Sequence, residues 1–243
     1  MNSILNISFY MFTPLENLEE YCNKYRAHCR SLSIIGTIIF SSEGINGSLA
    51  GEPEAVQEIK RIILAEKVFK DIEFKESYSS IVPFKKLIVK IRPTLLSFNA
   101  NDIHPEKETG NYITPKELKH WLDTKKDFIL LDTRNTYEIQ FGTFEKAQTL
   151  PLRHFRHFPK QLDALKDELK NKTVVMFCTG GIRCEKATAY AKKIGLNDVY
   201  QLKGGILKYF EECGGAHYQG KCFVFDDRIT VNSLLEETKK TND

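Results

Sequence analysis

Apolar residues in the first 95 positions recur with two different periods, one typical of strands and one of helices. Stretches rich in β-branched and aromatic side chains predict strands, and stretches with apolar residues at three- and four-residue steps predict helices. The predicted elements are strand 4–11, helix 15–30, strand 33–41, strand 48–50, helix 52–66, strand 71–78 and strand 84–92. This β-α-β-β-α-β order with one extra strand is typical of a ferredoxin-like (acylphosphatase-like) α+β domain.

From residue 113 onward, short apolar runs alternate with amphipathic stretches. Thr114-Pro115-Lys116-Glu117 has the residues of a capping box with proline in the first turn, so a helix is expected to begin there. The other predicted elements are strand 128–133, helix 160–169, strand 173–178, helix 184–195, strand 199–202 and helix 206–213. Strands that alternate with helices predict an α/β domain with a central parallel sheet covered on both faces.

The two patterns are separated by a stretch rich in Pro, Asn, Asp and Gly, which is interpreted as a linker. The predicted organisation is a ferredoxin-like domain over 1–95, a linker over 96–112, an α/β domain over 113–215 and a C-terminal extension over 216–243. The charged and polar end of that extension, residues 236–243, is expected to fray.

Composition narrows the class of protein. The 243 residues are 42% hydrophobic, yet no apolar run is long enough to span a bilayer and the N-terminus has no features of a secretory signal. We therefore expect a cytoplasmic protein with no membrane partner. The net charge of +3 gives no indication of DNA binding, and an RNA partner would need a local basic patch.

The six cysteines include no CxxC pair, which argues against a zinc ribbon or a thioredoxin-like site. Without a secretory signal, reduced thiols are expected, and no metal site is predicted. Cys22 and Cys29 fall on the apolar stripe of the first helix and are expected in the core. Cys213 and Cys222 are two possible ligands or disulfide partners, which alone make a weak case for a metal.

The segment after strand 173–178 carries the most informative chemistry. It places Cys178 at the carboxyl end of a buried strand, where open α/β sheets bind ligands, and a loop of Thr179, Gly180, Gly181, Ile182 and Arg183 leads into a helix. Glycine-permitted turns beside a helix N-terminus direct backbone N–H groups to one point and stabilise an anion there. We therefore expect the loop cysteine to be a thiolate at neutral pH, with the arginine adding a fixed positive charge.

Loop length separates two chemistries. Cysteine-dependent phosphatases have five residues between cysteine and arginine, whereas four lie between Cys178 and Arg183. A smaller ring leaves little room for a tetrahedral phosphate but enough for one extra sulfur atom. The spacing favours a persulfide on Cys178 over a phosphocysteine.

These residues resemble the active-site loop of the rhodanese family. Segments 131–134 (LDTR), Glu138 and 142–144 (GTF) are similar to that family's supporting Asp-x-Arg, Glu and Gly-His-Ile elements, with Thr143 in place of the usual histidine. Segment 203–206 (KGGI) is similar to the glycine turn before the last rhodanese helix. The resemblance implies a rhodanese-like catalytic domain over about 113–215.

Three further segments together resemble a narrower family, the rhodanese-like tRNA uridine hydroxylases: 42–47 (SEGING), 178–187 (CTGGIRCEKA) and 222–228 (CFVFDDR). This resemblance spans almost the whole chain. It implies oxygen-dependent hydroxylation of the wobble uridine of tRNA to 5-hydroxyuridine, with Cys178 as the catalytic residue, tRNA as partner and molecular oxygen as co-substrate. Thr149-Leu150 departs from the Asn-Pro that the family usually has there. No motif for haem, flavin or non-haem iron is evident.

Two other functions use features of the same sequence. A rhodanese-type sulfurtransferase would move sulfane sulfur through a Cys178 persulfide in the same loop. A non-catalytic RNA-binding or regulatory module is the third alternative, against which the intact Cys178 and Arg183 argue.

Supporting residues are expected around the loop. Asp132 and Arg134 are interpreted as an ion pair that braces it. Cys184, in the first turn of the following helix, is either a resolving thiol or a packed small residue. Gly44-Ile45-Asn46-Gly47 is expected as a hairpin turn, with a substrate-facing role as the alternative.

A local basic patch occurs at residues 151–160, which contain Arg153, Arg156 and Lys160 and no acidic residue. The interleaved Phe155 and Phe158 would suit stacking on RNA bases. The alternative is a helix-entry loop with a solvated basic face.

Overall fold

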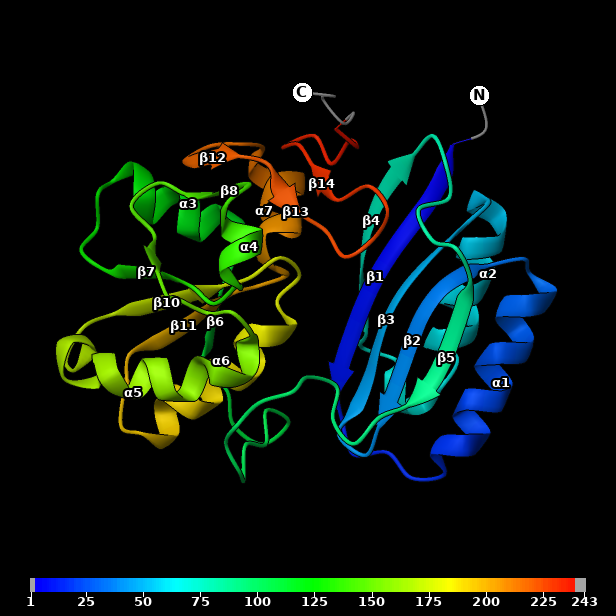
Figure 1. Cartoon of the computed structure of the whole chain (residues 1–243), viewed down its shortest axis with the longest axis horizontal. Coiled ribbons are helices and arrows are strands. Elements are labelled where there is room, and N and C mark those ends of the chain that lie inside the picture. The colour runs from blue at the N-terminus through cyan, green and yellow to red at the C-terminus, as the bar shows by residue number, and fades with distance from the viewer. Residues whose placement is uncertain (1–2, 239–243) are drawn as a thin grey trace. The chain divides into compact units, whose positions relative to one another are not determined.

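A computed structural model describes residues 3–238 of the chain, which form two compact units (Figure 1). Unit 1 comprises the chain up to Leu95 together with Asp226–Arg228, and unit 2 comprises Leu96–Phe225 and the chain from Ile229 onward. Residues 239–243, most of the C-terminal run that was expected to fray, lie outside the described part.

Unit 1 is a five-stranded sheet with two helices. Its elements are β1 (Ile4–Phe12), α1 (Leu18–Ser31), β2 (Ile35–Ser41), β3 (Gly44–Gly51), α2 (Pro53–Leu64), the short 3-10 helix η1 (Lys67–Phe69), β4 (Glu73–Ser79) and β5 (Leu87–Ile91). The strand order β4-β1-β3-β2-β5 is the ferredoxin-like order with β5 added beside β2, in parallel. Side chains from both helices join the strands in one core, which includes Cys22 and Cys29 as expected. The predicted ferredoxin-like fold is confirmed.

The prediction of a turn at Gly44–Gly47 is wrong, because these residues belong to β3. The chain turns at Ser42-Glu43, and the following four residues pair with β1 and β2. Gly44 has a φ of 138°, and a Cβ atom there would lie 2.0 Å from the Met11 carbonyl oxygen. A Cβ at Gly47 would lie 2.3 Å from the Phe9 ring. Both glycines are therefore required by close packing inside the sheet rather than by a turn.

Unit 2 is built around a parallel sheet with the order β6-β11-β10-β7-β9. The elements are β6 (Asn111–Ile113), α3 (Pro115–Asp123), β7 (Ile129–Asp132), α4 (Thr136–Ile139), β8 (Gly142–Phe144), β9 (Gln148–Thr149), the 3-10 helix η2 (Phe155–His157), α5 (Phe158–Leu169), β10 (Val174–Phe177), α6 (Ile182–Lys193), β11 (Val199–Leu202), α7 (Gly205–Cys213), β12 (Tyr218–Gly220), β13 (Cys222–Phe223) and β14 (Thr230–Val231). The capping box predicted at Thr114 is present at the start of α3.

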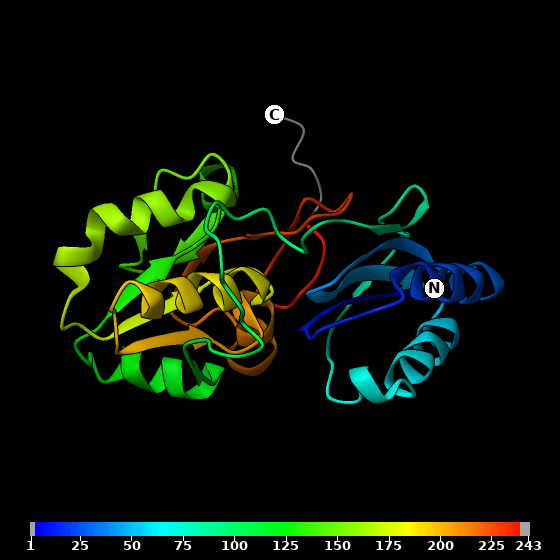
Figure 2. The same cartoon turned by 90° about the horizontal axis from the view of Figure 1, so that it is seen from below.

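Helices cover both faces of this sheet, as the apolar run of β10 predicts (Figure 2). Val174 and Met176 pack with residues of α5 and α6, whereas Val175 and Phe177 pack with residues of α3 and α7. The alternation follows from the two-residue period of a strand. It places the next residue, Cys178, on the side of α6.

The predicted linker stretch 96–112 is part of unit 2, where Leu96 and Phe98 pack against the core that α5 and α6 share. The domain limits predicted from the sequence remain predictions. None of the helices within residues 3–238 is long and apolar enough to cross a membrane.

Candidate active site around Cys178

Cys178 lies directly after β10, at the carboxyl end of the parallel sheet of unit 2. The residues up to Gly181 form a tight loop, and α6 begins at Ile182. The cysteine side chain is fully buried and belongs to the core under α6. β7 ends beside this loop, because Phe177 of β10 pairs with Asp132 of β7.

Backbone N–H groups form the cradle that the sequence predicts. Gly181 donates its N–H to the Cys178 Sγ atom at 3.1 Å. Its φ of 98° lies in a region that favours glycine. Gly180 has no such requirement, because a Cβ atom there would meet nothing within 4 Å. The expectation that both glycines supply special backbone geometry therefore holds for Gly181 alone.

A second helix holds the loop from the other side. Ile206 and Leu207 in the first turn of α7 donate their N–H groups to the carbonyl oxygens of Cys178 and Thr179, at 3.0 and 3.1 Å. Gly205 permits this approach, since a Cβ atom there would lie 2.5 Å from the Cys178 carbonyl oxygen. The glycine turn 203–206 thus acts on the cysteine loop through backbone hydrogen bonds.

Arg183 occupies the first turn of α6, although the sequence pattern predicts it in the loop before the helix. Its guanidinium donates to both carboxylate oxygens of Glu138, at 2.6 Å each. Arg183 is 5% exposed and Glu138 is fully buried. The charge predicted for the site is present, and a bidentate partner fixes its orientation.

The electrostatics of the loop favour a thiolate at Cys178. Burial raises the pKa of the Cys178 thiol, because it disfavours the charged form. A hydrogen bond from the Cys184 thiol, the charge of Arg183 and backbone N–H groups of the loop outweigh that effect, and the pKa of Cys178 falls from 9.0 to about 5. At neutral pH the sulfur is therefore an anion, the form that acts as a nucleophile.

The other five cysteines show the opposite shift. Burial is the largest cause that raises the pKa at each of them: Cys22, Cys29, Cys184, Cys213 and Cys222. All six thiols are free, so Cys213 and Cys222 form no disulfide. Within residues 3–238, no three His, Cys, Asp or Glu side chains are grouped so as to hold a metal ion.

Cys184 lies under the cysteine loop and hydrogen-bonds to Cys178. Its sulfur also lies 3.7 Å from the hydroxyl oxygen of Thr133, which itself donates to the Phe177 carbonyl oxygen at 2.9 Å. These contacts hold Cys184 as a buried neutral thiol that donates toward the Cys178 thiolate. Its role as a resolving thiol remains a prediction.

Asp132 and Arg134 form a fully buried ion pair, with Arg134 Nη2 2.6 Å from Asp132 Oδ2. Arg134 also donates to the Gly142 carbonyl oxygen at 2.7 Å, and Thr143 donates its hydroxyl to Asp132 Oδ2 at 2.7 Å. The pair thus joins β7 to β8. Thr143, the residue that departs from the rhodanese pattern, completes this network.

The structure buries some residues of the basic run 151–160 and exposes others. Phe155 and Phe158 are buried and pack against Phe98 in the core, so the interpretation that they stack on RNA bases is wrong. Buried and exposed residues alternate along this run because α5 begins here, and every third or fourth residue of a helix faces the core. The basic candidates Arg153, Arg156 and Lys160 are exposed.

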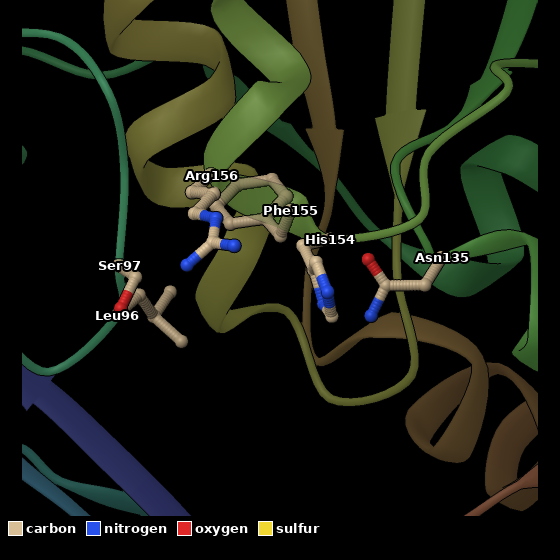
Figure 3. A pocket seen from close by; sticks show the side chains of 6 residues that line it. All are labelled: Leu96, Ser97, Asn135, His154, Phe155 and Arg156. Carbon is tan, nitrogen blue, oxygen red and sulfur yellow. The ribbon is translucent and has the colours of Figure 1, made fainter.

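One of these basic side chains lines a pocket. The pocket has a volume of about 220 Å³ and is lined by Leu96, Ser97, Asn135, His154, Phe155 and Arg156. Figure 3 shows Asn135 and His154 side by side, with Arg156 on the side of Leu96 and Ser97. Arg153 and Lys160 are not among the lining residues.

Glu138 has a larger role than the rhodanese motif alone implies. Its carboxylate orients Arg183 and also accepts the Asn135 backbone N–H at 3.2 Å, which caps the start of α4. Asn135 and Glu138 have the three-residue spacing of a capping box, and this local signal in the sequence could have identified Glu138.

Sequence comparisons match both parts of the chain to known families. Residues 4–95 match the family described as UPF0176 acylphosphatase like domain, and residues 114–212 match the rhodanese-like domain. A protein named tRNA uridine(34) hydroxylase from Paraburkholderia phytofirmans is 42% identical over 98% of this chain and 86% of its own length. A protein of the same name from Cupriavidus taiwanensis is 44% identical over 96% of this chain and 84% of its own length. The solved rhodanese-like domain from Anabaena sp is 20% identical, with a TM-score of 0.39, over 46% of this chain and 80% of that chain.

Proposed function

The chain belongs to the family of tRNA uridine(34) hydroxylases, and on this premise we propose that it converts uridine 34 of tRNA to 5-hydroxyuridine at Cys178. In this proposal the partner is tRNA, the site of action is the cytoplasm, and neither DNA nor a membrane is involved.

The observation that carries the proposal is the environment of the Cys178 sulfur. It accepts a hydrogen bond from the Gly181 N–H at 3.1 Å and lies in the field of Arg183, so that its pKa is lowered to about 5. A thiolate at neutral pH is a strong nucleophile and also forms a persulfide readily. A serine hydroxyl in the same place would have neither property.

Two roles for this thiolate lead to the same product. Addition of the sulfur to the uracil ring would make its 5-carbon electron-rich, and a Cys178 persulfide would act as a reductant or oxygen carrier. Both roles require the anionic sulfur and the backbone cradle. Hydroxylation by molecular oxygen inserts one oxygen atom at the 5-carbon and reduces the other to water, with two electrons and two protons from a thiol reductant.

Isotope labelling tests the proposed co-substrate. Purified protein, tRNA that lacks the modification and a thiol reductant are incubated under ¹⁸O₂, and the nucleosides are analysed by mass spectrometry. The expected product is 5-hydroxyuridine that carries the heavy isotope. Heavy oxygen incorporated from H₂¹⁸O instead would exclude molecular oxygen as the source.

Sulfur transfer is the alternative that uses the same loop. Both reactions begin at the Cys178 thiolate, so the contacts of the loop do not separate them. The separation comes from the product, which is a hydroxylated nucleoside in one case and thiocyanate from thiosulfate and cyanide in the other.

A further inference from the structure

Four aromatic side chains form a cluster beside the cysteine loop of unit 2: Tyr137, Phe141, Phe223 and Phe225. Phe223 lies at the centre, with ring centroids 5.4 Å from Tyr137, 5.8 Å from Phe141 and 5.2 Å from Phe225. α4, which carries Tyr137, lies against β13, which carries Phe223 (Figure 1). We call this group the aromatic cluster.

The aromatic cluster is tied to the residues that hold Cys178. Thr179 donates its hydroxyl to the Phe223 carbonyl oxygen at 3.4 Å. The Arg183 guanidinium lies 5.6 Å from the centre of the Phe225 ring. Tyr137 directly precedes Glu138, the carboxylate partner of that guanidinium. Two contacts and one sequence neighbour therefore connect the cluster to the residues that hold Cys178.

The outer rings of the aromatic cluster face solvent. Phe225 is 61% exposed, Phe141 is 42% exposed and Tyr137 is 41% exposed. Contiguous exposed apolar surface is uncommon on a soluble protein and marks a place where something binds. The planes of Tyr137 and Phe225 meet that of Phe223 at 83° and 87°, so these rings are not stacked in parallel with it.

Flat rings that remain exposed beside the cysteine loop suit one kind of occupant. An unpaired nucleobase stacks on aromatic rings, and the contact tolerates any base because each has a π-face. The Arg183 guanidinium lies behind the Phe225 ring and is already bound to Glu138, so the exposed ring faces supply the contact.

We propose that the aromatic cluster stacks on unpaired bases of the tRNA anticodon loop and positions uridine 34 at the Cys178 loop. The inference rests on the proposed function, because the substrate supplies the bases. Phe225 and Tyr137 are positioning residues in this account and take no part in the reaction at the sulfur.

Two substitutions test the proposal, Phe225→Leu and Tyr137→Leu, which keep apolar volume and remove the ring face. Loss of one stacked base costs about 1–3 kcal/mol, which corresponds to a rise of roughly 5- to 150-fold in KM for tRNA. The turnover number, the thermal midpoint and the alkylation rate of Cys178 are expected to stay near their original values. Phe225→Trp restores the ring and should restore KM.

The matched control is Tyr78→Leu, a tyrosine on the edge strand β4 that is 53% exposed. Its KM for tRNA should not change. An unchanged KM in Phe225→Leu and Tyr137→Leu as well would overturn the proposal. So would a rise that Phe225→Trp fails to restore, because a protein partner or a packing role would then explain the rings better.

A binding measurement separates this proposal from the proposed function. An anticodon stem-loop RNA with 2-aminopurine next to position 34 loses fluorescence when that base stacks on a ring. The original protein should quench the probe and Phe225→Leu should not. Quenching without hydroxylation would refute the proposed function alone, whereas hydroxylation without any difference between the two proteins would refute the aromatic cluster alone.

Discussion

The Arg183 guanidinium and the Glu138 carboxylate are joined by two hydrogen bonds of 2.6 Å in a site that solvent barely reaches. Arg183 contributes its charge to the Cys178 thiolate, and Glu138 fixes where that charge lies. The pair therefore links the stability of α4 and α6 to the chemistry of the loop.

Glu138→Gln is expected to destabilise the protein markedly. The substitution leaves the Arg183 charge buried without a charged partner, and breaking a buried pair in this way costs about 3–5 kcal/mol. Urea unfolding followed by circular dichroism measures the change. The control is Glu211→Gln, which removes one partner of an exposed pair on α7 and should leave the midpoint nearly unchanged.

The double variant Glu138→Gln with Arg183→Met distinguishes lost charge pairing from lost packing. It removes both charges together, so no buried charge is left without a partner, and much of the lost stability should return. A double variant that is less stable than Glu138→Gln alone would show that packing of the arginine stem, rather than charge pairing, dominates.

The pH profile of alkylation should set Cys178 apart from the other thiols. With its pKa lowered to about 5, Cys178 is already a thiolate at pH 6, so its rate with iodoacetamide should be nearly flat from pH 6 to pH 8 and fall below pH 5. The pKa of Cys213 is raised, chiefly by burial, so its rate should rise about tenfold per pH unit over the same range. Peptide mass spectrometry reads both sites in one sample.

The pH profile of alkylation, measured in the double variant Glu138→Gln/Arg183→Met, tests which interaction lowers the pKa of Cys178. Because the Arg183 charge stabilises the thiolate, its removal should move the Cys178 midpoint to higher pH. An unmoved midpoint would assign the lowered pKa to the backbone N–H groups and Cys184 alone.

The basic residues of segment 151–160 should contribute to tRNA affinity. Phosphate contacts release counterions, so Arg153→Ala/Arg156→Ala should weaken binding and make the slope of log affinity against log salt shallower by about 2. Lys166→Ala/Lys170→Ala is the matched control, with the same loss of charge at the far end of α5. Equal effects of the two pairs would show that only net charge matters.

Local patterns were enough to predict much of the fold. β10, the loop after it and α6 follow one another within about twenty residues, and periodicity with a glycine-permitted turn identifies them directly. The same holds for the capping box at Thr114. These elements depend on interactions between neighbours in the chain, which a single sequence displays.

Contacts between segments that lie far apart in the chain could not be predicted from local sequence patterns. Asn46-Gly47 has the residues of a hairpin turn, but close approach of the Phe9 ring explains that glycine better. The basic residues around Phe155 and Phe158 favour an RNA-stacking surface when only local sequence is considered, but both rings pack against Phe98, about 60 positions earlier in the chain. The partner of Arg183 lies 45 positions earlier, and only the parallel pairing of β7 with β10 brings it close.

The central claim is that Cys178 performs the hydroxylation of uridine 34, and mass spectrometry of tRNA nucleosides tests it most directly. A strain that lacks its own enzyme receives the original protein, Cys178→Ser or the control Cys213→Ser. The account predicts 5-hydroxyuridine-type nucleosides with the original protein and the control, and none with Cys178→Ser, because a serine hydroxyl at its ordinary pKa is no substitute for a thiolate. If 5-hydroxyuridine-type nucleosides are absent from all three strains, and the purified original protein rapidly transfers sulfur from thiosulfate to cyanide, the claim is contradicted. The loop would then be assigned to sulfur transfer.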